Sequence, residues 1–209
     1  KALMKKPWEG HKKGAEKLNQ VLKWTRDADI KEVTFYAFSI QNFNRPKKEF
    51  DFLMKIFNNM LSELLNERFE ELKEKKVRIK FVGRLRMFPE TLRNLMNELE
   101  EKTNGFDKYR VNICLGYGGQ EELIDAINKI LGEKLEKINI EKFPKYLYLN
   151  SQPDIIIRTG GERRLSNFLT WQSVYSELFF LDVMWPDFSE EDFQKVIREY
   201  ESRERRFGR

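Results

Sequence analysis

The sequence predicts an α/β protein in which a mostly parallel sheet is flanked by helices and residues 1–209 form a single domain. Stretches with the apolar spacing of helices alternate along the chain with short runs rich in β-branched and aromatic residues. No linker rich in Pro, Gly or Ser interrupts this alternation. Polar residues also gather directly after three of the strand-like runs, where open sheets of this kind place their sites.

The predicted elements follow one another in a regular order. Helical spacing predicts helices over residues 14–27, 46–76, 89–102, 119–132 and 189–206. The last of these begins at Ser189, a favoured helix-capping residue. The β-rich runs between the helices predict strands over residues 32–39, 77–83, 110–117, 154–160 and 177–183. Because helices and strands alternate, we expect the strands to pair mostly in parallel, with helices on both faces of the sheet.

Charge and cysteine content limit the possible function classes. The net charge is only +5, with acidic and basic residues interspersed, so the sequence permits an anionic partner without identifying one. The single cysteine, Cys114, lies in an apolar run, which predicts a buried thiol and a reducing, cytoplasmic compartment. No apolar run approaches the ~18 residues of a membrane span, so we expect contact with a membrane to be peripheral at most.

The stretch RTGGERRLSNF, residues 158–168, carries the strongest functional signal because it crowds positive charge at the end of a buried strand. Three arginines, Arg158, Arg163 and Arg164, offer permanently charged, fork-shaped guanidinium groups, and Ser166 offers a hydroxyl. The two glycines, Gly160 and Gly161, let backbone N–H groups approach an anion closely. This set predicts a phosphate or diphosphate site. The alternative is a solvated turn whose arginines pair with Glu162 and nearby acids.

A second polar cluster follows the strand predicted over residues 32–39. Ser39, Asn42 and Arg45 offer hydroxyl, amide and guanidinium groups just beyond that strand. The next helix displays an apolar face at spacings of three and four, formed by Phe50, Leu53, Phe57, Met60, Leu61 and Leu64. Core packing explains most of this face. A long apolar helix that begins at an anion site is also what a tunnel for a hydrocarbon tail requires.

The remaining signals are one histidine and several absent motifs. His11 precedes a helix whose N-terminal amides could help it to hold an anion. The sequence has no GxxxxGK[ST], GxGxxG, HExxH or DDxxD pattern. Ordinary nucleotide, dinucleotide and zinc-protease functions therefore lack their residues.

Five blocks resemble, in order and along nearly the whole chain, the cis-prenyltransferases of the undecaprenyl diphosphate synthase family: GHKKGAEKL, EVTFYAFSIQNFNRP, NICLGYGG, PDIIIRTGGERRLSNFLTWQSVYSELFF and WPDF. The resemblance implies Mg²⁺-dependent elongation of an allylic diphosphate, farnesyl or geranylgeranyl diphosphate, by isopentenyl diphosphate. Each new double bond would be cis, and the product a long-chain polyprenyl diphosphate. A homodimer is also implied, as is a sheet of about six strands, the first upstream of residue 1, beside an apolar tunnel.

The resemblance implies roles for individual residues around the diphosphates. The clamp for the isopentenyl diphosphate headgroup corresponds to Arg158, Arg164 and Ser166, shaped by Glu162, Gly160 and Gly161. Glu177 resembles the Mg²⁺-binding carboxylate of the family, a hard oxygen ligand. His11 is similar to a histidine near the allylic diphosphate.

Two further segments resemble a mobile loop of the family's active site and a C-terminal tail that the family shares between subunits. Ser39, Asn42 and Arg45 match a mobile loop that helps to orient the diphosphate and the departing proton. Phe38 and Phe43 resemble the apolar contacts of that loop. The tail RRFGR contains an R-x-G pattern, Arg206 and Gly208, which in this family can reach the active site of the partner subunit.

The sequence departs from the family pattern at a few positions. The family's aspartate, in an MDGNxRW-type motif that binds the allylic diphosphate and Mg²⁺, would lie upstream of residue 1, so we expect residues 1–209 alone to be nearly inactive. Pro7 stands where relatives often carry an arginine, with Lys5 and Lys6 nearby. Gln41 and Gln120 replace a Glu and an Arg that are common in the family.

Two other functions stay open at this point. One is a noncatalytic partner subunit of a two-subunit cis-prenyltransferase, although such partners tend to lose the arginine clamp that this chain keeps. The other is a basic nucleic-acid-binding protein, which predicts a continuous face of Lys and Arg. The interspersed acids, and arginines confined to strand ends, count against nucleic acid as a partner. Abundant Lys and Glu suit a thermophile, and archaeal members of the family are described as using a geranylgeranyl primer.

Overall fold

The structure is a computed structural model that describes residues 7–203 of the chain, with the side chains of residues 13–203. Its helices are α1 (Pro7–Asp27), α2 (Lys47–Asn66), α3 (Phe69–Glu74), α4 (Glu90–Thr103), α5 (Gly119–Gly132) and α6 (Glu190–Ser202). Its strands are β1 (Glu32–Ser39), β2 (Val77–Val82), β3 (Tyr109–Tyr117), β4 (Ile155–Arg158) and β5 (Glu177–Phe180). Short 3-10 helices lie at Ile40–Asn44 (η1), Leu85–Met87 (η2), Phe143–Tyr146 (η3) and Trp185–Asp187 (η4). The predicted alternation of helices and strands is confirmed.

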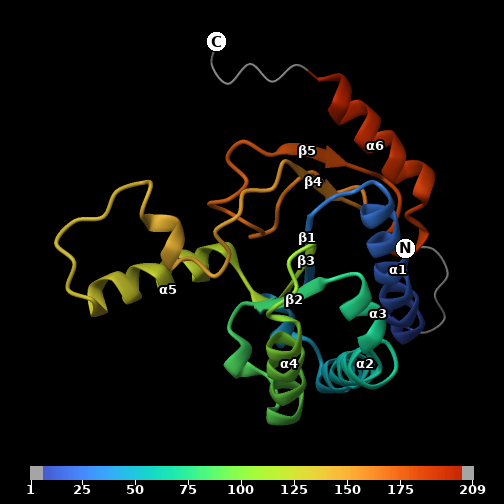
Figure 1. Ribbon diagram of the computed structural model, residues 1–209, viewed down its shortest axis with the longest axis horizontal. Coiled ribbons are helices and arrows are strands. Elements are labelled where there is room, and N and C mark those ends of the chain that lie inside the picture. Colours follow the sequence, from blue (N-terminus) through green and yellow to red (C-terminus); the bar gives the residue numbers. More distant parts are fainter. Residues whose placement is uncertain (1–6, 204–209) are drawn as a thin grey trace.

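The strands pair in parallel, as predicted, but they form two sheets. One sheet has the order β1-β3-β2, and the other consists of β4 and β5 (Figure 1). The expectation of one sheet of about six strands is therefore wrong for the described residues. Within the described residues, β1 pairs only with β3, and β4 pairs only with β5. Each of β1 and β4 therefore has one edge that pairs with no described strand.

The helix expected over residues 46–76 is two helices, because the chain turns at Glu67 and Arg68. The backbone N–H groups of Glu67 and Arg68 both donate to the carbonyl oxygen of Glu63, at 2.9 and 3.1 Å. Arg68 thus bonds five residues back instead of four, which ends α2, and α3 begins as a separate helix at Phe69. The turn contains no Pro or Gly, so no residue type in this segment marks it as a break between helices.

A bulge in β1 decides which way its last residues face. Tyr36 lies opposite Cys114 of β3, but Phe38 lies opposite Leu115, so Ala37 is an extra residue. Phe38 therefore packs with Leu115 in the main core cluster, on the face of the sheet covered by α2 and α4. Tyr36 stays with Cys114 on the other face. Adjacent residues at the end of β1 thus have different surroundings.

The core is rich in aromatic side chains. Phe38 is 2% exposed, and its ring centroid lies 5.6 Å from that of Phe88. A second cluster around Trp24 and Phe188 joins α1 to α6. Cys114 is completely buried, as predicted, and burial raises the pKa of its thiol. Within residues 7–203, none of the helices combines the length and apolar character needed to cross a bilayer.

Candidate active site

Three polar segments meet beyond the carboxyl ends of β1, β3 and β4, as the sequence predicted. An open pocket of about 530 Å³ lies at this edge and is lined by Tyr36, Ser39, Gln41, Asn42, Ser166 and Asn167. The first four of these residues come from the end of β1 and from η1, and the last two from the loop after β4. The start of α5 joins the same loop, because the N–H of Gly119 donates to the carbonyl of Asn167 at 2.7 Å.

Arg158 ends β4 and holds the loop that follows it. Its Nη1 donates a hydrogen bond of 2.7 Å to Oγ of Ser166 and a second bond to the carbonyl oxygen of Arg164. Ser166 and Asn167 both have left-handed backbones, with φ of 50° and 65°. This conformation is uncommon outside glycine and concentrates at functional sites. The loop therefore has a defined shape that presents Ser166 to the pocket.

The glycine pair shapes this turn but does not offer its amides. Gly160 and Gly161 have φ of 95° and 76°, which a side chain would strain. Their N–H groups donate to the carbonyls of Val183 and Leu181, at 2.8 and 2.9 Å. Because the segment after β5 already occupies both donors, these two N–H groups are not available to an anion. The predicted anion site at this turn stays a prediction.

Arg164 pairs with an acid of its own loop. Its Nη1 lies 2.8 Å from Oε2 of Glu162, and both side chains are more than half exposed. This pairing is the one that the solvated-turn alternative expected. The Arg158 side chain is partly buried and fixed at the pocket, whereas that of Arg164 is in solvent and has to move to reach an anion beside Ser166.

The segment after β1 is divided between the pocket and the core. Oδ1 of Asn42 accepts a 2.8 Å hydrogen bond from the N–H of Ser39, which fixes η1 against the strand end. Arg45 does not line the pocket and forms an ion pair with Glu49 in the first turn of α2. Phe38 and Phe43 pack edge to face, with ring centroids 5.0 Å apart. Since Phe38 is buried, its side chain belongs to the core and not to the surface of the polar pocket.

Tyr36 was not singled out from the sequence, and the structure places it in the lining of the pocket. Its hydroxyl lies 3.2 Å from the carbonyl oxygen of Tyr117 and 3.3 Å from that of Ser166, so it can donate to either. Its ring stacks on Phe168, with centroids 4.7 Å apart. Burial raises the pKa of Tyr36 to about 12, so the hydroxyl remains a donor at neutral pH. A tyrosine in an apolar strand gives no sequence signal of this role.

Asn167 was also missed as a site residue, and it ties the loop to α5. Its Oδ1 accepts from the N–H of Gln120, and its Nδ2 donates to Oε2 of Glu121, both at 2.8 Å. A Cβ on Gly119 would lie 2.0 Å from Oγ1 of Thr170, so only glycine allows this approach. The side chain of Gln120 is exposed, whereas its backbone N–H takes part in the network.

Glu177 is not brought to the arginine cluster. It opens β5 opposite Ile155, whereas Arg158 lies opposite Phe180 at the other end of the strand pair, about 10 Å away along the strands. The Glu177 carboxylate forms an ion pair with Arg203. Within the part of the chain that the structure describes, no group of three metal-binding side chains comes together. A carboxylate oxygen suits Mg²⁺, so Glu177 could supply one ligand from this position.

Three predicted site residues lie outside this description. The backbone of His11 is in the first turns of α1, but its side chain is outside the described residues. Arg206 and Gly208 follow the last described residue. Their predicted roles at an allylic diphosphate and in a partner's site therefore stay predictions.

An apolar cavity of about 130 Å³ lies on the face of β1 that is opposite the polar pocket. Part of the predicted apolar face of α2 lines it, namely Phe57, Met60, Leu61 and Leu64. Phe50 and Leu53 instead pack in the core. The opposite wall is α1, through Leu18 and Leu22, which the sequence did not assign to a cavity. Ala37 lines this cavity while Tyr36 and Ser39 line the polar pocket, so the two spaces adjoin across β1.

Comparison with known proteins places the whole chain in one group. Residues 1–208 match the profile of the family described as "Putative undecaprenyl diphosphate synthase". A tritrans,polycis-undecaprenyl-diphosphate synthase (geranylgeranyl-diphosphate specific) from Thermoplasma volcanium is 47% identical over 209 residues, which cover 96% of this chain and 80% of the relative. A protein of the same name from Methanocaldococcus jannaschii is 45% identical, with coverage of 96% and 74%.

Two solved structures share the fold. The crystal structure of a probable undecaprenyl diphosphate synthase from Campylobacter jejuni superposes with a TM-score of 0.84 at 31% identity, covering 95% of this chain and 93% of that one. Lavandulyl diphosphate synthase from Lavandula x intermedia, in complex with dimethylallyl diphosphate, superposes with a TM-score of 0.87 at 30% identity, with coverage of 97% and 89%.

Proposed function

The chain belongs to the undecaprenyl diphosphate synthase family of prenyltransferases, and we propose that it catalyses cis-prenyl chain elongation. An allylic diphosphate primer condenses repeatedly with isopentenyl diphosphate to give a long-chain polyprenyl diphosphate. The names of the archaeal relatives support geranylgeranyl diphosphate, rather than farnesyl diphosphate, as the primer. Residues 1–209 form one cis-prenyltransferase domain in this proposal.

The observation that carries the proposal is the pairing of an arginine-fixed polar pocket with an apolar cavity across a single strand. A prenyl diphosphate has one highly charged end and one hydrocarbon end. Arg158 and Ser166 lie at the polar pocket, and Ala37 and Phe57 line the apolar cavity. Each end of the substrate therefore meets the environment that it prefers.

The residues of the pocket can perform the positioning that the reaction needs. Loss of diphosphate from the primer leaves a carbocation, which the double bond of isopentenyl diphosphate attacks before a proton departs. Arg158, with Arg164 moving in from solvent, holds the isopentenyl diphosphate headgroup beside Ser166. Ser39 and Asn42 face the same pocket and orient the diphosphate and the departing proton. Fixing the two substrates in line supplies much of the rate enhancement.

Mg²⁺ is part of the proposal as the ion that neutralises diphosphate charge when it is bound. Glu177 is the residue proposed to contribute an oxygen ligand, and diphosphate oxygens supply others. Its ion pair with Arg203 has to open for this role. His11 is proposed to lie near the allylic diphosphate, and Arg206 and Gly208 to approach a partner's site.

We also propose a cytoplasmic homodimer with at most peripheral membrane contact. Ile124, Ile127 and Leu131 lie on one face of α5 and are 54%, 44% and 66% exposed in the single chain. A second copy that covers this face would bury these side chains. The mass of the protein in solution tests this, since Leu131→Glu should shift a dimer toward monomers.

The test of activity uses labelled isopentenyl diphosphate, Mg²⁺ and farnesyl or geranylgeranyl diphosphate, with the protein expressed from its complete gene. We expect long polyprenyl products with the wild type, and none with Arg158→Ala. If the wild type forms no product, the catalytic proposal is wrong, and the noncatalytic partner subunit becomes the favoured function.

A further inference from the structure

The apolar cavity is too small for a long product. A cavity of about 150 Å³ accommodates one benzene molecule, so the 130 Å³ observed here matches about one five-carbon unit. A tail of many such units therefore cannot be contained unless the cavity widens or the tail leaves it.

The length of β1 leads to the same conclusion. Its eight residues span about 23 Å from Ser39 at the polar pocket to Glu32 at the opposite end. An isoprene unit adds four carbon–carbon bonds along the chain, or roughly 5 Å when extended. A tail of more than about five units thus reaches beyond the amino ends of the strands.

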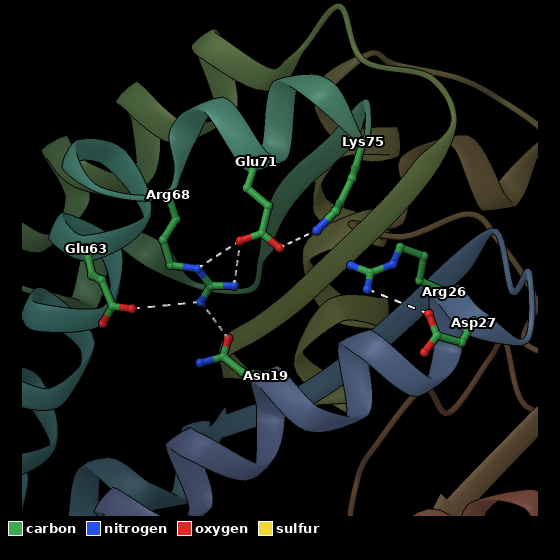
Figure 2. Close-up of polar contacts among 7 residues, drawn as sticks. All are labelled: Asn19, Arg26, Asp27, Glu63, Arg68, Glu71 and Lys75. Carbon is green, nitrogen blue, oxygen red and sulfur yellow. Dashed lines mark hydrogen bonds and ion pairs between the residues drawn. The ribbon is translucent and has the colours of Figure 1, made fainter.

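The cavity meets polar side chains at the amino ends of the strands. Its lining there includes Val77 and Tyr109, the first residues of β2 and β3. The polar residues that the helices and their ends contribute here include Asn19, Arg26, Glu63, Arg68, Glu71 and Lys75 (Figure 2). They come from α1, from the end of α2 and from α3, so the far end of the cavity is a seam between helices.

Arg68 connects the helices at this seam. Its Nη1 donates a 3.0 Å hydrogen bond to Oδ1 of Asn19 on α1 and lies 3.8 Å from Oε1 of Glu63 on α2. Its Nε and Nη2 both donate to Oε2 of Glu71 on α3, at 3.2 Å. Figure 2 shows these contacts converging on one guanidinium. The turn that ends α2 at Arg68 is what places its side chain between the three helices.

The hydrogen bonds and ion pairs of Arg68 are partly exposed to solvent, so they can break and re-form at little cost in stability. The side chains of Arg68, Glu63 and Glu71 are 31%, 49% and 39% exposed, and ion pairs this close to water contribute little to stability. Hydrogen bonds from Lys75 and Arg68 hold the pKa of Glu71 below its usual range, so this carboxylate stays charged at neutral pH. By contrast, widening the cavity elsewhere would disturb buried residues such as Leu61 and Ile79.

We propose that Arg68 and Asn19 form a latch across the far end of the cavity, that the growing tail displaces this latch, and that its strength limits product length. The inference rests on the proposed function, because the tail is that of the polyprenyl product. With the latch closed, the tail meets charged groups and elongation slows. With the latch open, the tail passes between α1 and the junction of α2 and α3.

The first measurement compares product lengths made by the wild type, Arg68→Met and Asn19→Ala. Methionine keeps an aliphatic side chain of similar length but removes the charge and all hydrogen-bond donors. Lys73→Met is the matched control, because Lys73 lies on α3, close to Arg68 in the chain, and pairs with Glu70 but does not line the cavity. We expect both latch variants to shift the product distribution toward longer chains by at least one isoprene unit, and the control to leave it unchanged.

A binding measurement separates failure of the latch from failure of the proposed function. The affinity of each variant is measured for geranylgeranyl diphosphate and for a series of longer polyprenyl diphosphates. Affinity should rise with the length of the polyprenyl ligand and then level off. We expect it to level off at a shorter ligand in the wild type than in Arg68→Met. A wild type that forms product, with unchanged lengths and unchanged binding in both latch variants, overturns the latch. If the wild type forms no product, but the chain length at which affinity stops rising is still greater in Arg68→Met than in the wild type, the latch is supported and the catalytic proposal is overturned.

Discussion

Nη1 of Arg158 donates a 2.7 Å hydrogen bond to Oγ of Ser166, which joins the end of β4 to the loop beside the end of β1. The same guanidinium group donates to the carbonyl of Arg164. A guanidinium has five N–H donors in a fixed fork, so other donors remain for a diphosphate. Arg158 therefore both shapes the pocket and carries its permanent charge.

We predict that Arg158→Lys will lower kcat/KM for isopentenyl diphosphate by about 10²- to 10³-fold, because lysine keeps the charge but loses the fork. Steady-state kinetics with saturating primer measure this change. Arg78→Lys is the control, since Arg78 lies on β2 and bonds to Asn104 at 2.5 Å. Equal kcat/KM in the wild type and Arg158→Lys would show that charge alone suffices.

Asn167→Ala should weaken both the fold and the activity. The change removes the hydrogen bonds to Gln120 and Glu121 and places alanine in a left-handed backbone. We expect a loss of about 1 to 3 kcal/mol in the free energy of unfolding, or several degrees in Tm. Asn167→Gly separates the two causes, because glycine relieves the backbone strain without restoring the bonds. Identical losses in both variants would assign the whole effect to the hydrogen bonds.

Glu122 should be among the most sensitive residues of the core. Its carboxylate is 1% exposed and accepts hydrogen bonds from the Tyr117 hydroxyl, from the Gln172 amide and from the backbone N–H groups of Tyr148 and Leu149. Glu122→Ala leaves these donors buried without a partner, so we expect a loss of about 3 to 5 kcal/mol in urea unfolding. Glu122→Gln keeps one acceptor oxygen and should lose less. An alanine variant as stable as the glutamine variant would contradict this account.

The pair of Arg84 and Asp125 should make stability depend on acid pH. Two hydrogen bonds, of 3.0 and 2.9 Å, join the guanidinium to the carboxylate. With Tyr148 as a further donor, they hold the pKa of Asp125 below its usual range. A lowered folded-state pKa stabilises the fold above the unfolded value of about 3.9 and ceases to do so as pH falls through the folded value.

Asp125→Asn should therefore cost about 1 kcal/mol at pH 7, and this difference from the wild type should shrink below about pH 4. Urea unfolding at several pH values measures it. Glu70→Gln, which removes an exposed ion pair with Lys73, is the control and should show no such trend. A difference that stays constant down to low pH would exclude the ion pair as its cause.

Glu177→Gln tests the metal assignment. If Glu177 binds Mg²⁺, its loss should raise the Mg²⁺ concentration needed for half-maximal rate by at least about tenfold. Glu199→Gln is a close control, because Glu199 is the other acid paired with Arg203. The same Mg²⁺ requirement in both variants would assign Glu177 to the ion pair and not to the metal. Removal of Mg²⁺ by a chelator should abolish product formation in the wild type.

The local sequence pattern predicted most helices and strands. It did not predict the details of their geometry, which depend on how the elements pack in the folded chain. The strand over residues 32–39 was predicted from its β-rich composition, but the bulge at Ala37 depends on its register with β3. The helix predicted over residues 46–76 had unbroken apolar spacing, yet the turn at Glu67 and Arg68 divides it into α2 and α3. Helical propensity does not report such a turn when neither Pro nor Gly marks it.

The sequence by itself determined the α/β class, the order of elements, the family resemblance and the grouping of Arg158 with Ser166, because these depend on residue types and short spacings. Only the tertiary structure decided that Tyr36 and Asn167 belong to the pocket, that the Gly160 and Gly161 amides are occupied, and that Glu177 lies at the far end of the strand pair. Each of these facts depends on contacts between segments distant in sequence, whose geometry is fixed only when the strands pair and the core packs.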